Sequence, residues 1–206
     1  MRWREPERSS PAFLVVGLGN PGEEHEGTRH NVGAEVVEIL AARHGGRLRR
    51  SKERALVDEV KIAGQRVALA VPVTYMNLSG EAVGLLTRRH RVGPDQTVVV
   101  HDELDFPVAR LQVKAGGGLA GHNGLRSIVA HLHTQEFLRV RIGIGRPPGR
   151  REGADHVLRR FSKAERSLVD VTLEEAAEAI EVIVAEGVAA AMNRFNRAGS
   201  GEPLEE

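Results

Sequence analysis

Residues 13–31 read FLVVGLGNPGEEHEGTRHN, and this stretch decides the fold. The apolar run from Phe13 to Val16 ends in a Gly- and Pro-rich turn that reaches Gly22, a pattern typical of a buried strand followed by a tight turn. Open α/β sheets place their sites at the carboxyl edge of such strands. His30 follows the turn, and a histidine at this edge is a candidate proton acceptor.

Outward from this stretch, strand-like and helix-like patterns alternate. Apolar or β-branched runs predict strands over 13–18, 55–62, 66–71, 97–100, 110–114 and 138–144, and helical periodicity covers 32–44, 78–90, 125–132 and the chain from 162 onward. We expect an α/β fold: a single domain with a mixed, mostly parallel twisted β-sheet, flanked by helices on both faces, and a helical C-terminal region. This domain is expected over residues 12–197, between disordered segments at 1–11 and 198–206.

Two local signals sharpen this prediction. Ala63-Gly64-Gln65 separates two strand-like runs, which favours a hairpin. Ser162 followed by Glu165 matches a capping box at the start of a helix.

The composition excludes several classes of chemistry. The 206 residues include no cysteine, which rules out disulfides, zinc–cysteine sites and cysteine nucleophiles. Basic and acidic residues nearly balance, 29 against 28, so net charge neither requires nor excludes a nucleic-acid partner. No apolar run reaches the ~18 residues of a membrane span, and the N-terminal residues lack the apolar segment of a secretory signal. We therefore expect a soluble, cytoplasmic protein.

Gly17, Gly19 and Gly22 match a dinucleotide fingerprint literally, which would indicate a nucleotide-dependent oxidoreductase. The match is weak, because the following EEHEG is a poor helix and no acidic residue ends a second strand ~20 residues on. Binding of NADH would be needed to support this alternative.

A second polar cluster, His101 to Asp105, follows the strand predicted over 97–100. Asp102 is the best candidate to point inward and orient a base, whereas Glu103 and Asp105 are expected to be solvated. A metal site would need a second ligand cluster of matching spacing, which the sequence does not offer. No metal and no cofactor are therefore expected.

Two further loops carry polar groups next to glycines. Residues 116–124 form a Gly-rich loop between Lys114 and Arg126, which suits contact with a phosphate or sugar-phosphate. Tyr75 and Asn77 stand together before the helix predicted over 78–90. Because no serine lies in a nucleophile elbow, hydrolysis here would use water activated by a histidine, with Asn amides stabilising the developing oxyanion.

Taken in order, these segments resemble the bacterial peptidyl-tRNA hydrolases. The matching motifs are GLGNPG at 17–22, TRHN at 28–31, YMNLSG at 75–80, HDELD at 101–105, GGG at 116–118, GHNGL at 121–125 and RVRIGIG at 139–145. Each motif alone is weak, but their order and spacing match across roughly residues 13–197.

The resemblance implies hydrolysis of the ester that joins a peptide to the terminal ribose of tRNA, which releases tRNA during translation and ribosome rescue. It implies that His30 activates water and that Asp102 holds the imidazole and stabilises its protonated form. Asn20 would contact the peptide backbone. Asn77 and Asn123 would bind substrate near the ester.

The same resemblance implies that Tyr75 packs beside the terminal nucleotide or the peptide. Lys114 and Arg141 would contact tRNA phosphates, which position a nucleic acid without reading its sequence. Peptidyl-tRNA is thus the expected partner, without a membrane or metal, and we expect a monomer.

Three residues depart from the family pattern: His25 replaces a tyrosine, Ala120 a glycine and Arg159 a common glycine. Ala120 is harmless if its φ is negative and strains the loop if its φ is positive. None is expected to touch His30 or Asp102, so we expect activity. The alternative is a tRNA- or ribosome-associated binding homologue with weakened catalysis.

Overall fold

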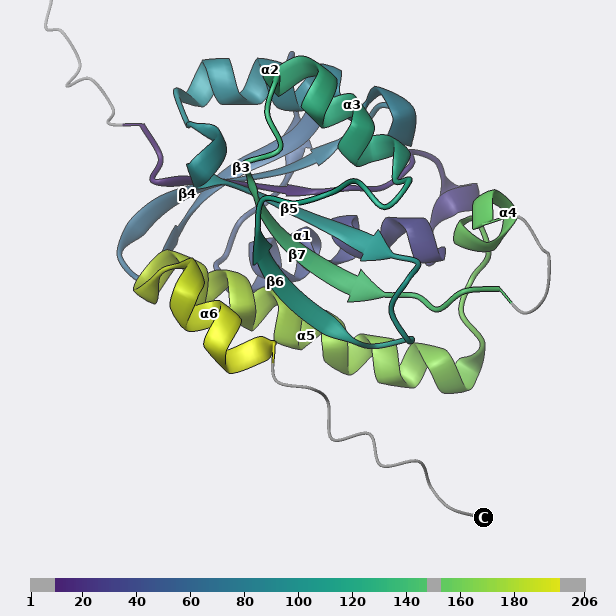
Figure 1. The fold of residues 1–206 in the computed structure, drawn as a ribbon. Coiled ribbons are helices and arrows are strands. Elements are labelled where there is room, and N and C mark those ends of the chain that lie inside the picture. Colours follow the sequence, from purple (N-terminus) through teal and green to yellow (C-terminus); the bar gives the residue numbers. More distant parts are fainter. Residues whose placement is uncertain (1–9, 148–152, 197–206) are drawn as a thin grey trace, which may run out of the picture.

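The computed structural model describes residues 10–147 and 153–196. Within them lies one seven-stranded sheet of order β2-β3-β4-β1-β5-β7-β6 (Figure 1). Its strands are β1 (Phe13–Gly17), β2 (Arg49–Arg50), β3 (Ala55–Ile62), β4 (Gln65–Pro72), β5 (Thr97–Glu103), β6 (Leu111–Ala115) and β7 (Leu138–Gly143).

The direction of the strands follows from their connections. The four central strands, β4, β1, β5 and β7, run parallel to one another. The flanking strands pair in antiparallel fashion: β2 with β3, β3 with β4, and β6 with β7. A turn at Ala63-Gly64 joins β3 and β4 as the predicted hairpin. The mixed sheet is confirmed, and its parallel centre brings the carboxyl ends of β1, β5 and β7 to one edge.

Helices cover both faces of the sheet, as predicted. Figure 1 shows α2 (Ser79–His90) and α3 (Asn123–Leu132) on one face, and α5 (Lys163–Glu186) and α6 (Val188–Phe195) on the other. The residues of α1 (Val32–Arg43) share a core with those of α5. The short α4 (Gly153–Val157) and the 3₁₀ turns η1 (Glu23–His25), η2 (Arg29–Asn31), η3 (Met76–Leu78) and η4 (Pro94–Gln96) complete the set.

No helix among the described residues is both long enough and apolar enough to cross a membrane.

The two cores explain why β1 reads as a continuous apolar run. Leu14 and Val16 pack in the core shared with α2 and α3, and Val15 packs in the core shared with α1 and α5; all three are fully buried. Successive side chains of a strand point to opposite faces, so a strand covered on both sides must be apolar throughout.

Two glycines allow α1 to approach the sheet closely. A Cβ atom on Gly17 would lie 2.2 Å from the carbonyl oxygen of Gly33, and a Cβ on Gly33 would lie 2.2 Å from that of Val100. The first turn of α1 therefore rests directly on the ends of β1 and β5. This contact determines how near η2, which precedes α1, comes to β5.

Most predicted boundaries agree with the structure within two residues, and the capping box of Ser162 and Glu165 is present. The strand expected over 97–100 is longer, because β5 continues pairing with β7 as far as Glu103. The prediction that Glu103 is solvated is wrong: it is 3% exposed and pairs with Arg141. Apart from residues 10 and 11, the terminal extensions lie outside the described residues.

Candidate active site

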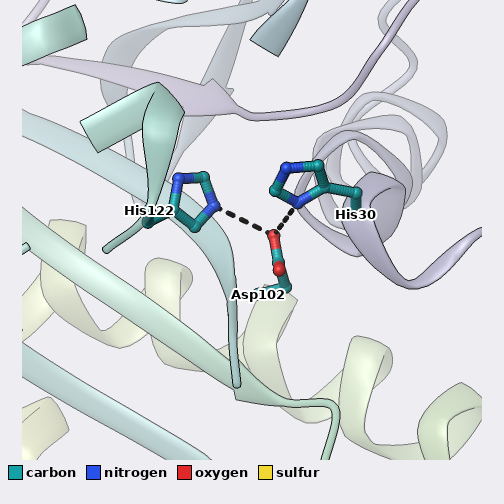
Figure 2. Close-up of side chains that lie close together, drawn as sticks. All are labelled: His30, Asp102 and His122. Atoms are coloured by element: carbon teal, nitrogen blue, oxygen red, sulfur yellow. Dashed lines mark hydrogen bonds and ion pairs between the residues drawn. The ribbon is translucent and has the colours of Figure 1, made fainter. Parts of the chain in front are cut away.

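His30 and Asp102 lie 72 residues apart in sequence and meet at the edge where β1 and β5 end. The turn η2 delivers His30, and β5 delivers Asp102; both are buried. The His30 Nδ1 and Asp102 Oδ1 atoms are 2.8 Å apart. An ionised carboxylate only accepts, so Nδ1 carries the proton and the lone pair of the neutral ring lies on Nε2. Figure 2 shows this second nitrogen turned away from Asp102.

His122 also bonds Asp102, from the opposite side (Figure 2). Its Nε2 lies 3.0 Å from the same Oδ1 atom, while its Nδ1 accepts the backbone N–H groups of Gly124 and Leu125 as the N-cap of α3. A backbone N–H only donates, so Nδ1 must hold a lone pair and Nε2 the proton. The helix cap thus fixes the tautomer of His122 and leaves it no free nitrogen for accepting a proton.

Asp102 stays ionised in this setting. Burial by itself raises its pKa, but the neighbouring imidazoles of His30 and His122 outweigh this effect and hold the pKa well below the ordinary value of an aspartate. A permanent negative charge therefore stands behind the ring of His30.

A third imidazole, His101, is fully enclosed behind the pair. Burial lowers its pKa to about 3, so the ring is neutral. Its Nδ1 donates to the backbone oxygen of Asp102 at 2.7 Å, and its ring packs edge-on against His122 at 5.1 Å. His101 therefore supports the strand backbone at Asp102 and takes no part in proton transfer.

His30, Asp102 and His122 bring three potential metal-ligand atoms within 4.8 Å of one another. The hydrogen bonds do not suit a metal ion. A ring that ligates through Nε2 carries its proton on Nδ1, and in His122 that atom accepts two N–H groups. Metal binding through Nε2 of His122 would therefore break the two hydrogen bonds that cap α3. These residues fit proton transfer better than metal binding.

A cavity of about 250 Å³ opens beside His30 and Asp102. One side is formed by the Gly-rich loop, with Ala120 and Asn123, and the other by α4, with Ala154 and Val157. Figure 1 shows α4 beyond the carboxyl ends of β5 and β7. The cavity combines apolar walls with the few polar groups that fix a ligand, as small-molecule sites do.

Asn20 is bonded to Asn31, the residue that follows His30. Its Oδ1 accepts the backbone N–H of Met76 at 2.8 Å, and its backbone N–H and oxygen bond the side chain of Asn31 at 2.9 and 3.0 Å. Its Nδ2 has no partner among the residues that the structure describes. The side chain therefore presents a fixed amide donor.

Asn77 and Asn123 come close to each other because the residues next to them in sequence, Met76 and Gly124, are in contact. Met76 lies so close to Gly124 that a Cβ on Gly124 would come within 2.6 Å of the Met76 sulfur. Asn77 and Asn123 are the exposed residues next to this contact. Contacts through Met76 and Gly124 thus link all three predicted asparagines to the cap of α3.

The other predicted binding residues differ in how exposed they are and in whether their side chains already have partners. Tyr75 is 60% exposed at the start of η3, and Lys114 is exposed on β6. Arg141 is already engaged, with Nη2 2.7 Å from Glu103 and its guanidinium 4.4 Å above the ring of Phe106.

The departures from the family pattern lie beside the site. His25 Nδ1 bonds the backbone oxygen of Pro21 at 2.8 Å and so closes the turn after β1. Ala120 has a φ of 46°, the strained case for a residue with a Cβ. It borders the cavity but does not bond His30 or Asp102.

The sequence showed the motif around His122 but did not indicate that His122 would bond Asp102 alongside His30. The available signal was its place one residue before a helix, where a polar side chain caps the backbone. A histidine is an unusual cap, and only the fold shows that the other ring nitrogen reaches Asp102.

Comparisons with known proteins point the same way. The sequence model of a family described as peptidyl-tRNA hydrolase matches residues 14–203. The peptidyl-tRNA hydrolase of Frankia alni is 49% identical over 184 residues, 89% of this chain and 93% of its own, and that of Nocardia farcinica is 50% identical over 189 residues, 91% and 98%. A crystal structure of peptidyl-tRNA hydrolase from Acinetobacter baumannii has a TM-score of 0.86 and 39% identity, covering 93% of this chain and 98% of that one.

Proposed function

The chain belongs to the peptidyl-tRNA hydrolase family, and from this premise we propose that it hydrolyses the ester between a peptide, or an N-blocked amino acid, and the 3′-terminal ribose of tRNA. The observation that carries the proposal is the state of His30: Nδ1 donates to the ionised Asp102, and Nε2 is left with a lone pair at the cavity. That is the arrangement of a general base.

The reaction follows from this arrangement. Nε2 of His30 takes a proton from water as the water oxygen attacks the ester carbon, and Asp102 stabilises the imidazolium that forms. The tetrahedral intermediate then expels the ribose oxygen, which receives the proton from His30. The products are a free carboxylic acid and tRNA with a free ribose hydroxyl.

The asparagines supply hydrogen bonds without adding a charge. The free Nδ2 of Asn20 contacts the peptide backbone and distinguishes an acylated amine from a free ammonium group, which only donates. Asn123 lines the cavity, and Asn77 is exposed next to the contact between Met76 and Gly124; their amide N–H groups stabilise the oxyanion of the intermediate. Tyr75, exposed beside Asn77, packs against the terminal nucleotide or the peptide.

Contact with the tRNA phosphates rests mainly on Lys114, an exposed residue of β6. Arg141 contributes with the N–H groups that Glu103 and Gln112 leave unused. Because the substrate is a product of translation, we place the enzyme in the cytoplasm, acting as a monomer.

The test compares hydrolysis of an N-blocked aminoacyl-tRNA with hydrolysis of the same tRNA bearing a free amino group, for wild type and His30→Ala. We expect cleavage of the blocked ester alone, abolished in the variant while tRNA binding persists. Turnover by His30→Ala would refute the assignment of the base. Binding of tRNA without cleavage by wild type would instead identify a binding homologue with weakened catalysis.

A further inference from the structure

Arg29 precedes His30 and is itself buried, with 6% of its surface exposed. Its Nη1 donates to the backbone oxygens of Arg160 at 2.6 Å and Arg159 at 3.3 Å, and its guanidinium lies 4.7 Å from the ring centre of Phe161. The side chain thus holds three consecutive residues, 159–161, that are about 130 positions away in sequence. We call these contacts the grip of Arg29.

The same guanidinium also bonds the first turn of α5. Its Nη2 lies 3.0 and 2.9 Å from the two carboxylate oxygens of Glu165. Glu165 is the acidic member of the capping box and accepts the backbone N–H of Ser162 at 2.8 Å. One carboxylate therefore ties the helix cap to the residue next to the proposed base.

The gripped segment connects α4 to α5, and α4 has little packing of its own. None of its five residues is buried, although Ala154 and Val157 line the cavity beside His30. A helix of one turn is not stable by itself in water. The position of this cavity wall must therefore come from its neighbours, of which the segment held by Arg29 is one.

We infer that Arg29 is a positioning residue for hydrolysis, which holds α4 as the wall of the substrate cavity. It acts through residues 159–161 and through Glu165, and it does not touch the reacting atoms. The inference rests on the proposed function. His30 is held separately, by Asp102 and by the packing of α1 on the sheet, so loss of the grip should weaken substrate binding more than the chemical step.

The capping box offers a matched pair of variants. Glu165→Gln retains an oxygen for the N–H of Ser162 but removes the charge facing Arg29. Ser162→Ala removes the side-chain cap but leaves the pair of Arg29 and Glu165 intact. The two variants perturb the same helix turn, and only the first weakens a contact of Arg29, the ion pair with Glu165. Arg29→Lys is a second route, since a lysine keeps the charge but cannot span the carbonyls and the carboxylate together.

The readouts are KM and kcat for an N-blocked aminoacyl-tRNA, and hydrogen exchange of the amides of residues 153–157 in the free enzyme. For Glu165→Gln and Arg29→Lys we expect KM to rise about fivefold or more with kcat changed less than about twofold, together with faster exchange in α4. Ser162→Ala should lower the melting temperature with KM and α4 exchange near the wild-type values.

The inference would be overturned if Glu165→Gln and Arg29→Lys both left KM and the hydrogen exchange of α4 unchanged. A loss of kcat alone in these two variants would also overturn it. A rise in KM for Ser162→Ala equal to that for Glu165→Gln would show that helix stability, not the grip, is responsible. The wild-type rate in the same assay separates these results from failure of the proposed function, and the exchange measurement requires no activity.

Discussion

Replacement of Asp102 by asparagine tests the proposed chemistry most directly. The side chain keeps its shape, but the negative charge beside the imidazolium of His30 is lost. The two groups are joined at 2.8 Å, so their charges are centred about 4 Å apart, and an effective dielectric constant near 20 gives about 4 kcal/mol of stabilisation. At 1.36 kcal/mol per decade, kcat/KM should fall about 10³-fold.

The assay is hydrolysis of an N-blocked aminoacyl-tRNA at pH 7, with tRNA binding and the melting temperature measured for each variant. Asp105→Asn is the matched control, because Asp105 is an exposed carboxylate in the turn that follows β5 and its side chain pairs only with Arg146 among the described residues. We expect near wild-type kinetics for this control. A fall of less than about tenfold for a folded Asp102→Asn enzyme would refute the view that Asp102 stabilises a protonated His30.

Four further outcomes are expected. The imidazole of His101 binds a proton below about pH 6.5 in the unfolded chain but only below about 3 in the folded one, so the unfolded state binds more protons between these values. The free energy of unfolding, measured with urea, should therefore fall by about 2 kcal/mol from pH 6.5 to 4.5. A flat profile would contradict the buried, neutral state of His101. Ala120→Gly relieves a positive φ and should raise the urea midpoint, by about 1 kcal/mol of stability, whereas a loss would show that the loop is unstrained. Gly33→Ala places a Cβ 2.2 Å from the oxygen of Val100 and should cost about 3 kcal/mol in the same experiment; a wild-type midpoint would mean that α1 does not need this close approach. Lys114→Ala should weaken tRNA binding and lower the slope of log affinity against log salt by about one, and a slope equal to that of wild type would remove Lys114 from the interface.

The sequence by itself predicted most of the helices and strands and named the candidate residues of the site. Local signals sufficed for the hairpin turn at Ala63-Gly64 and the cap formed by Ser162 and Glu165, since each depends on residues a few positions apart. The apolar run at 13–18 predicted a buried strand, and the structure shows β1 covered on both faces. His30 and Asp102 were predicted from their motifs, and the fold brings them together.

The tertiary structure alone decided which polar groups pair. Glu103 looked like a solvated acid, but β5 continues its ladder with β7 and places it beside Arg141 in a buried position. His122 was one polar residue in a Gly-rich loop until the start of α3 fixed its tautomer and aimed its other nitrogen at Asp102. The ion pair of Arg29 and Glu165 spans 136 positions. Periodicity and capping report interactions between near neighbours in the chain, whereas burial and charge pairing depend on contacts that exist only once distant segments have packed.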